Sequence, residues 1–437
     1  MDSVIKELYK TYLSNPVVCT DSRNIKKGSV FFALKGENFN GNQFAEQALK
    51  EGCSYAVIDE DKYKKGRQYF LVSNVLETLQ QLANHHRKQL HIPVIAITGS
   101  NGKTTSKELT TTVLNKKYFT LATQGNLNNH IGVPLTLLSI NRNHQVAVIE
   151  MGANHQGEIA ALCKIAEPNY GIISNIGRAH LEGFGGFEGV IKAKKEMYDF
   201  IKNNQGVLFV NADNDLLMDI SSDMDRILYG ISEKSDYIGQ FIEANPFVKL
   251  KWKKITSEKN IEDTTIINTQ LVGKYNFENI LLAICVGAYF RVDDFKIKEA
   301  IEDYVPSNNR SQIVKKNSNT ILLDSYNANP TSMAAAIENL SEMEAGNKVL
   351  ILGDMLELGA DSLKEHQLII DLIQKKNFNK IFLVGKWFSK ADNKINAVVF
   401  QNVETAAEWL RNNKLANVTV LIKGSRGMKL EKTVDSF

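Results

Sequence analysis

Features typical of secreted, membrane-bound or nucleic-acid-binding proteins are scarce in this sequence. Only four of the 437 residues are cysteine, and they lie apart, at positions 19, 53, 163 and 285, without a C-x-x-C pair. A disulfide framework or a zinc site is therefore not expected, whereas reduced thiols in a cytosol are. The longest apolar run, at 280–290, has 11 residues, well short of the roughly 20 that span a bilayer.

Charge and the first residues support the same expectation. The net charge of +3 is close to neutral for this length, so bulk electrostatics give no reason to expect nucleic-acid binding. The start, MDSVIKELYKTYL, is an amphipathic helical pattern with acidic residues and has no basic region followed by an apolar one. We expect a cytoplasmic protein with no signal peptide and no membrane insertion.

The length predicts about three domains, at roughly 150 residues each. Residues 1–88 hold short β-like pieces around a helical stretch, which predicts a small α/β module. Residues 89–305 alternate apolar strands with helices, which favours a parallel sheet covered on both faces. The segment VKLKWKKI (248–255) alternates apolar and basic residues, and we interpret it as a solvated edge strand and not a nucleic-acid patch. Residues 306–437 restart the α/β pattern and predict a doubly wound, Rossmann-like domain.

The stretch VIAITGSNGKTTSKEL (94–109) has the layout of a phosphate-binding loop: an apolar strand, a small-residue loop, then Lys103 and a helix. It departs from the pattern G-x-x-x-x-G-K-[ST], because the first glycine of that pattern would fall at Ile97. Gly99, Ser100, Asn101 and Gly102 can still turn tightly and aim backbone N–H groups at a phosphate. Lys103 and the N-terminus of the helix that follows add positive charge.

Hard oxygen ligands for magnesium lie nearby in the predicted sheet. Thr104 follows the loop lysine directly, and Glu150 ends the apolar strand QVAVI at the same sheet edge. His180 lies in a glycine-rich loop, where we expect it to be exposed and functional. The glycines of GFGGFEG (183–189) do not match G-x-G-x-x-G, so no dinucleotide site is predicted there.

Motifs spread over nearly the whole chain resemble the ATP-dependent Mur ligases. They are ITGSNGKTT (97–105), NLNNHIGVPLTLL (126–138), IEMGANHQGEI (149–159), NIGRAHLEGFGG (175–186), VIKAKKEM (190–197), DSYNANPTSM (324–333), LGDMLELG (352–359) and IKGSRGMKLE (422–431). Residues 20–44 are similar to the UDP-sugar-binding N-terminal domain of the branch that uses D-alanyl-D-alanine. The family's loop, T-G-x-x-G-K-[TS]-[TS], also accounts for the position of Gly99.

The resemblance implies an ATP-dependent ligase of the cytoplasmic stage of peptidoglycan synthesis, with a small UDP-binding domain, a central ATP-binding domain and a Rossmann-like third domain. ATP would phosphorylate the terminal carboxylate of UDP-MurNAc-tripeptide, and the amine of D-alanyl-D-alanine would displace the phosphate from the acyl phosphate. It further implies two Mg²⁺ ions, the first on Thr104 and Glu150, the second on His180 and a carbamylated Lys194. Lys192 and Lys195 compete for that last role. We expect a monomer.

Further roles come from the resemblance, position by position. Arg310 matches an arginine that reaches the γ-phosphate, although Asn309 stands where the family usually has glycine. Catalysis would rest on Lys103, His180, Lys194 and Arg310. The expected ATP-binding residues are Gly99, Ser100, Asn101, Gly102, Lys103, Thr104, Thr105, Asn276, Asn279, Arg310, Asp324 and Asn327. The expected substrate-binding residues are Ser22, Arg23, Lys35, Asn126, Asn129, Lys423, Ser425 and Arg426.

Three alternatives stay open at this point. Another Mur-family ligase would add an amino acid at an earlier step, but the D-N-P-R motif of that branch is not found in this chain. A folylpolyglutamate synthase would share the loop without the LGDMLELG segment. A P-loop regulatory ATPase would hydrolyse ATP with no acyl acceptor.

Overall fold

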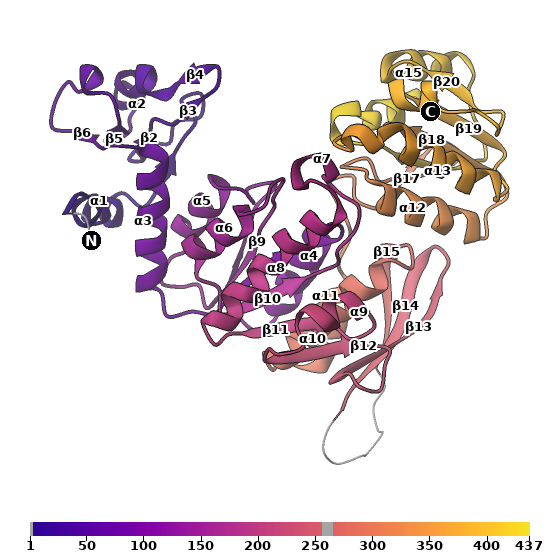
Figure 1. The fold of residues 1–437 in the computed structure, drawn as a ribbon, viewed down its shortest axis with the longest axis horizontal. Helices are drawn as coiled ribbons and strands as arrows, with labels where there is room; N and C mark the ends of the chain where they lie inside the picture. The colour runs from indigo at the N-terminus through magenta and orange to yellow at the C-terminus, as the bar shows by residue number, and fades with distance from the viewer. Residues whose placement is uncertain (1–2, 256–264) are drawn as a thin grey trace.

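The computed structural model describes residues 3–255 and 265–437, so Met1 and Asp2 of the predicted N-terminal helix lie outside the described residues. Over these ranges the strands form three main sheets, of four, nine and six strands. In Figure 1 the N-terminal body is joined by α3 (Val75–Gln89) to the central body, and the C-terminal body packs near α7 (Leu181–Phe184). The α/β fold with three sheet-containing units is confirmed. No helix in these ranges has the length and apolar character needed to cross a membrane.

The N-terminal sheet is parallel, with the order β1-β2-β5-β6. Alternate residues of β2 enter different cores: Phe31 packs with α2, whereas Val30 and Phe32 pack with α1 and α3. Large β-branched and aromatic residues therefore cover both faces, as a buried strand requires. Its elements are α1 (Ser3–Ser14), β1 (Val18–Cys19), β2 (Val30–Phe32), β3 (Lys35–Gly36), β4 (Phe39–Asn40), α2 (Ala45–Lys50), β5 (Tyr55–Ile58), β6 (Tyr69–Leu71) and α3, with 3₁₀ turns at Gly41–Phe44 and Asp61–Tyr63.

The central sheet has the order β15-β14-β13-β12-β11-β10-β7-β9-β8. Along β7, Ile95 and Ile97 face α4 and α10, whereas Val94 and Ala96 face α3, α5, α6 and α8. Two helical layers thus cover the parallel strands, as the continuous apolar runs predict. The elements are β7 (Val94–Thr98), α4 (Lys103–Leu114), β8 (Thr120–Ala122), α5 (Gly132–Leu138), β9 (Val146–Glu150), α6 (Glu158–Ala166), β10 (Tyr170–Ile173), α7, α8 (Phe187–Asn203), β11 (Val207–Asn211), α9 (Asp215–Ile220), β12 (Arg226–Gly230), β13 (Tyr237–Ala244), β14 (Phe247–Lys254), β15 (Thr265–Val272), α10 (Asn276–Tyr289) and α11 (Asp294–Glu302).

The predicted parallel sheet is confirmed for β7 to β13, whose pairings with one another are all parallel, whereas the prediction for 248–255 is wrong. The sheet is not parallel throughout, because β14 pairs antiparallel with β13 and with β15. The segment 248–255 is therefore not an edge strand. Its alternation has another cause: Val248, Leu250 and Trp252 are buried on one face, and the intervening lysines lie on the other. A half-buried antiparallel strand has this pattern whether or not it lies at an edge.

The C-terminal sheet has the order β16-β17-β21-β18-β19-β20, and only β16 runs antiparallel among its described strands. The α/β pattern predicted for residues 306–437 is confirmed by the strands β17 to β21 and the helices between them. Strand β16, which follows Arg310, pairs antiparallel with β17. The elements are β16 (Gln312–Lys316), β17 (Asn319–Leu323), α12 (Pro330–Glu342), β18 (Lys348–Gly353), α13 (Ser362–Gln374), β19 (Lys380–Val384), α14 (Lys386–Lys390), β20 (Val398–Phe400), α15 (Val403–Asn412) and β21 (Thr419–Lys423), with 3₁₀ turns at Gly359–Asp361, Arg426–Met428 and Leu430–Ser436.

Candidate active site

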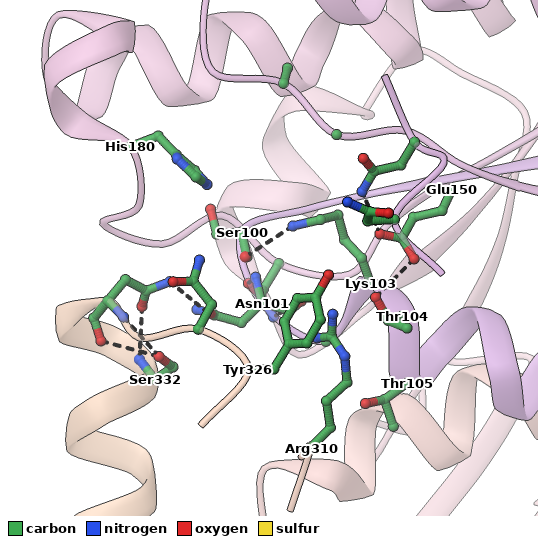
Figure 2. Close-up of a pocket in the computed structure, with 18 of the residues that line it drawn as sticks. Ser100, Asn101, Lys103, Thr104, Thr105, Glu150, His180, Arg310, Tyr326 and Ser332 are labelled. Atoms are coloured by element: carbon green, nitrogen blue, oxygen red, sulfur yellow. Dashed lines mark hydrogen bonds between the residues drawn. The ribbon is translucent and has the colours of Figure 1, made fainter. Parts of the chain in front are cut away.

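A cavity of about 850 Å³ lies between the central body, helix α3 and the C-terminal body, and Figure 2 shows a close-up of it. Its walls come from α3, from the ends of β7 and β9, from the start of α10, and from the segments that follow β17 and precede β16. Loops at the carboxyl ends of parallel strands are the usual place for a ligand in α/β proteins. The predicted site residues that line it are Ser100, Asn101, Gly102, Lys103, Thr104, Thr105, Asn126, Asn129, Glu150, His180, Asn276, Asn279, Arg310, Asp324, Asn327 and Lys423.

The loop between β7 and α4 needs glycine at two positions. Gly99 has φ +145°, and a Cβ there would lie 2.0 Å from the Ser174 hydroxyl oxygen. Gly102 has φ +76°, and its Cβ would lie 2.5 Å from Oδ1 of Asn279. Any side chain at either position would clash as well as strain the backbone. Gly99 itself lies behind the cavity wall, and its role is to let the loop turn.

Hydrogen bonds hold this loop against its neighbour after β10. The Ser100 hydroxyl donates to the Gly177 carbonyl at 3.0 Å, and the Asn101 N–H donates to Oδ1 of Asn175 at 2.9 Å. Asn175 also donates from its amide to the Asn101 carbonyl at 3.1 Å. The loop is therefore held in shape by protein contacts alone, which suits a rigid phosphate cradle.

Lys103 begins helix α4 and folds back over the loop (Figure 2). Its Nζ donates to the Gly99 carbonyl at 2.7 Å and to the Ser100 carbonyl at 3.2 Å. Burial lowers the pKa of Lys103 to about 8, and nearby Arg310 acts in the same direction. The ammonium therefore still predominates at neutral pH, beside the positive end of the α4 dipole.

Thr104 and Glu150 meet at the floor of the cavity. The Thr104 hydroxyl donates to Oε2 of Glu150 at 2.9 Å, and the Asn128 amide donates to Oε1 at 2.8 Å. The Glu150 side chain is buried, and these bonds orient its carboxylate. No group of three or more His, Cys, Asp or Glu side chains in residues 3–255 and 265–437 is arranged to hold a metal ion. Any ion here would depend on one carboxylate, one hydroxyl, water and a bound phosphate, which is how Mg²⁺ is commonly held.

Lys194 on α8 is buried beneath the cavity, with 2% of its surface exposed. Its Nζ lies 3.5 Å from the Thr98 hydroxyl and 5.5 Å from the centre of the Phe184 ring. Burial, with a smaller contribution from Lys103, lowers the pKa of Lys194 to about 7. The two lysines that compete with Lys194 for the carbamate are less buried. Lys192 is exposed, and Lys195 is half-buried in an ion pair with Asp199.

His180 lies in the loop between β10 and α7, and its ring centre is 6.4 Å from that of Phe184. The expectation of an exposed histidine is wrong, because only a quarter (25%) of its side chain is accessible. The C-terminal body covers the loop and places the carboxylate of Glu357 against Nδ1. In Figure 2 the ring points toward the phosphate loop.

The C-terminal body contributes a cation to the cavity. The guanidinium of Arg310 stacks on the ring of Tyr326 at 3.6 Å (Figure 2). Asn309, just before it, has φ +58°, a left-handed conformation that glycine favours and asparagine tolerates. Asparagine therefore fits where the family usually has glycine. Lys423 donates to Oδ2 of Asp324 at 2.5 Å.

The two predicted asparagines of α10 are held by internal bonds. The Asn276 amide donates to the Val272 carbonyl at 2.8 Å, and the Asn279 amide donates to Oδ1 of Asn276 at 3.0 Å. Ser106 donates to Oδ1 of Asn279 at 3.0 Å, which links α10 to α4. Both asparagines line the cavity, and both also hold its wall together.

Two predicted substrate residues near the C-terminus do not line this cavity. Ser425 is buried, donates to the Ala328 carbonyl at 3.2 Å and accepts from the Leu356 N–H at 2.9 Å, so it braces two loops. Arg426 pairs with Glu431 at 3.0 Å.

Three predicted substrate residues lie in the N-terminal body, away from the cavity lining. Ser22 and Arg23 follow β1, and Lys35 follows β2, so all three are at the carboxyl edge of that sheet. Arg23 pairs with Asp21 at 2.8 Å, and Lys35 pairs with Asp59 at 2.9 Å. They form a second polar edge, separate from the phosphate loop.

Several cavity residues were missed from the sequence. Asn128 lies beside two predicted asparagines in the same motif. Tyr326 lies between Asp324 and Asn327, and its contact with Arg310 could not be inferred without the fold. Asn329 donates its amide to Oδ1 of Asn101 at 2.7 Å and so ties the C-terminal body to the phosphate loop.

Family models match the chain in three consecutive stretches. Residues 17–97 match the Mur ligase family catalytic domain, 97–287 the Mur ligase middle domain, and 309–426 the Mur ligase glutamate ligase domain. The chain belongs to the Mur ligase family. As in the family's domain order, an N-terminal, a middle and a C-terminal unit each contain a largely parallel sheet.

Individual Mur ligases resemble this one over nearly their full length. UDP-N-acetylmuramoyl-tripeptide–D-alanyl-D-alanine ligase of Bacillus subtilis is 34% identical over 98% of this chain and 96% of its own. A crystal structure of MurF from Acinetobacter baumannii matches with a TM-score of 0.88 at 31% identity, covering 99% of this chain and 97% of its own. MurF from Thermotoga maritima, solved in complex with ADP, matches with a TM-score of 0.84 at 25% identity, covering 100% and 98%.

Proposed function

We propose that this Mur ligase uses ATP to join D-alanyl-D-alanine to UDP-N-acetylmuramoyl-tripeptide, in the cytoplasmic stage of peptidoglycan synthesis. The observation that carries the proposal is a single cavity faced by Lys103, Thr104 and Glu150 of the central body and by Arg310 of the C-terminal body. The full-length similarity to ligases of that name supports the substrate pair. The proposal includes domains at 1–88, 89–305 and 306–437, a monomer, and no nucleic-acid or membrane partner.

The reaction has an electrostatic difficulty that the cavity is suited to overcome. A peptide carboxylate must approach a triphosphate, and the two anions repel. One carboxylate oxygen attacks the γ-phosphorus, the bond from that phosphorus to the β-γ bridging oxygen breaks, and ADP leaves. The dipeptide amine then attacks the carbonyl carbon of the acyl phosphate, loses its proton, and expels phosphate. Fixed positive charge around the phosphoryl group lowers the barrier to phosphoryl transfer and the barrier to attack by the amine.

Each proposed phosphate contact rests on position and charge. The N–H groups of Gly102 and of the first turn of α4 would hold the phosphates, because the N–H groups of Ser100 and Asn101 already donate to Asn175. Lys103 would leave its loop carbonyls for the phosphates. Arg310 approaches from the C-terminal body, and its planar guanidinium is held on Tyr326 in an orientation suited to a phosphoryl group. Asn276, Asn279, Asp324 and Asn327 line the wall where the nucleoside would lie.

The residues present fit a first Mg²⁺. The Thr104 hydroxyl and the Glu150 carboxylate are adjacent hard oxygens beside the loop lysine, and a phosphate would complete the set. When bound, the ion would neutralise charge on the transferred phosphoryl group.

A second Mg²⁺ fits only if Lys194 changes its charge. An ammonium cannot bind a cation, but Lys194 has the lowered pKa of a buried amine. A neutral amine can add CO₂ and lose a proton, and the resulting carbamate offers hard oxygen ligands. His180 on the neighbouring loop would supply nitrogen. Carbamylation of Lys194 therefore belongs to the proposal.

Substrate would extend from the N-terminal body into the cavity. Ser22, Arg23 and Lys35 at the carboxyl edge of the first sheet would take the UDP group. Asn126 and Asn129 line the cavity and flank, in the sequence, the Asn128 that donates to Glu150. They would contact the peptide. Lys423, Ser425 and Arg426 are proposed for the dipeptide or phosphates, with Ser425 acting through its loop because it is buried.

Isotope transfer tests the proposed chemistry. UDP-MurNAc-tripeptide labelled with ¹⁸O in both oxygens of its terminal carboxylate should give phosphate with one ¹⁸O and a pentapeptide amide that keeps the other. Unlabelled phosphate would mean direct hydrolysis of ATP, as in a regulatory ATPase, and would end the ligase proposal. Replacing D-alanyl-D-alanine by a single amino acid tests the alternative of a Mur-family ligase that acts at an earlier step. Supplying glutamate with a folate acceptor tests the alternative of a folylpolyglutamate synthase.

A further inference from the structure

The loop that carries His180 is bound to the C-terminal body. Arg178 pairs through Nη2 with Oε1 of Glu365 at 2.7 Å, and its backbone N–H donates to the Thr331 hydroxyl at 3.3 Å. Two residues on, Nδ1 of His180 lies against the carboxylate of Glu357. Two contacts therefore dock the loop, and a third reaches the imidazole ring itself.

The contact between His180 and Glu357 joins two residues with unusual backbone geometry. His180 has φ +52° and Glu357 has φ +64°, in the left-handed region that residues with a Cβ seldom adopt. Such conformations persist where the surroundings hold them, and they cluster at functional sites. The Glu357 side chain is 59% exposed, so packing alone does not force its carboxylate onto the ring.

The loop that presents Glu357 is fixed at its start. The Met355 N–H donates to Nε2 of buried His366 at 3.0 Å, and the Leu356 N–H donates to the Ser425 hydroxyl at 2.9 Å. At its end, a Cβ on Gly359 would lie 3.2 Å from the side chain of Glu182, in the helix that follows His180. The loop around Glu357 is thus fixed on both sides, with Glu357 next to His180.

We propose that Glu357 is a positioning residue that sets the tautomer and ring orientation of His180. The inference rests on the proposed metal role of His180. A carboxylate at Nδ1 favours the tautomer with hydrogen on Nδ1, which leaves the lone pair of Nε2 free for a cation in the cavity. Metal-binding histidines commonly donate their other N–H to a carboxylate in this way.

The origin of Glu357 in another domain has a consequence for the reaction. Arg310 and Glu357 both belong to the C-terminal body, so a single docking event would bring the phosphate-binding arginine and prepare the histidine. An undocked C-terminal body would leave His180 free to adopt the other tautomer. Docking and competence of the second metal site are therefore coupled through one carboxylate.

Nitrogen NMR of metal-free full chain labelled with ¹⁵N-histidine tests the tautomer directly, and His180→Gln identifies the resonances among the eight histidines. At alkaline pH, where imidazole is neutral, we expect hydrogen on Nδ1 only. Glu357→Ala should shift the population toward hydrogen on Nε2, and Glu357→Gln should restore the original pattern because its amide oxygen accepts. A protonated Nε2 in the unaltered chain, or no change in Glu357→Ala, overturns the inference.

Mn²⁺ binding followed by electron paramagnetic resonance provides the second readout. The binding component lost in His180→Gln defines the histidine site, and Glu357→Ala should weaken that component by about 10- to 100-fold. Glu365→Gln is the matched control, because it removes a docking ion pair without touching His180, and it should leave the tautomer and the Mn²⁺ affinity unchanged. A Glu365→Gln variant that is still docked, as judged by small-angle scattering, and yet behaves like Glu357→Ala would overturn the inference, since the Glu357 carboxylate would then have no specific effect on the ring.

Failure of the inference and of the proposed function can be told apart. If Mn²⁺ binding is identical with and without His180, the second-metal role fails and the inference fails with it. If His180→Gln loses the site but Glu357→Ala does not weaken it, only the inference fails.

Discussion

Replacing Lys194 with methionine removes the amine but keeps the length and apolar stem of the side chain. The amine is buried, and its pKa falls from an ordinary 10.5 to about 7. At pH 7 about half of the amine is then neutral, compared with roughly one molecule in 3,000 for an exposed lysine. Since CO₂ adds only to a neutral amine, burial prepares this lysine for carbamylation.

We expect Lys194→Met to lower turnover by roughly 10²- to 10³-fold, the range for losing one preorganised charge-stabilising group. Phosphate release in the presence of tripeptide and dipeptide gives the rate. The unaltered chain in ¹³C-bicarbonate should show a carbamate carbon resonance, and Lys194→Met should lack it. Turnover should also fall as the pH drops below about 7, because the amine becomes protonated and the carbamate is lost.

Lys192→Met and Lys195→Met are matched controls on the same helix, since their ammonium groups are accessible to water. Both variants should keep the carbamate resonance and most of the activity. A resonance that survives Lys194→Met, or that disappears in either control, would refute the assignment. Unchanged turnover in Lys194→Met would remove its catalytic role altogether.

Three further results are expected. Gly99→Ala forces a Cβ to within 2.0 Å of the Ser174 hydroxyl oxygen. Calorimetry should show binding of a non-hydrolysable ATP analogue weakened by roughly 5- to 150-fold, the effect of about 1–3 kcal/mol of strain. An unchanged affinity would contradict the loop geometry. Tyr326→Leu removes the ring under Arg310 and should lower kcat roughly 3- to 30-fold, whereas Tyr326→Phe should not; equal kcat in both would contradict an orienting role. In metal-free, CO₂-free buffer between about pH 7 and 10.5, Lys194 takes up a proton when the chain unfolds. The free energy of unfolding should therefore rise with pH by about 1.4 kcal/mol per pH unit from this residue alone. Denaturation curves of Lys194→Met should lack that increment, and an identical pH dependence of the free energy of unfolding in both proteins would contradict the lowered pKa.

Features encoded in a contiguous stretch were predictable from the sequence. The strand, loop and helix around Lys103 follow one another directly, so their chemistry could be inferred before the fold was known. The bond from Thr104 to Glu150 was also accessible, because both residues end or follow parallel strands and such ends share one edge.

Features that depend on how distant segments meet were not predictable. The alternation in 248–255 is the same for an edge strand and for an inner antiparallel strand, and only the pairing with β15 distinguishes them. His180 was expected to be exposed because its own loop is polar and glycine-rich. Its partial burial comes from the C-terminal body, which places Glu357, 177 residues further along the chain, against it.

Product formation tests the central proposal most directly. The purified chain with ATP and Mg²⁺ is given UDP-MurNAc-tripeptide, D-alanyl-D-alanine, both or neither, and phosphate and nucleotide-linked peptide are measured together. We expect UDP-MurNAc-pentapeptide and phosphate in equal amounts only when both substrates are present. Phosphate release that is indifferent to the dipeptide, with no pentapeptide formed, would contradict it.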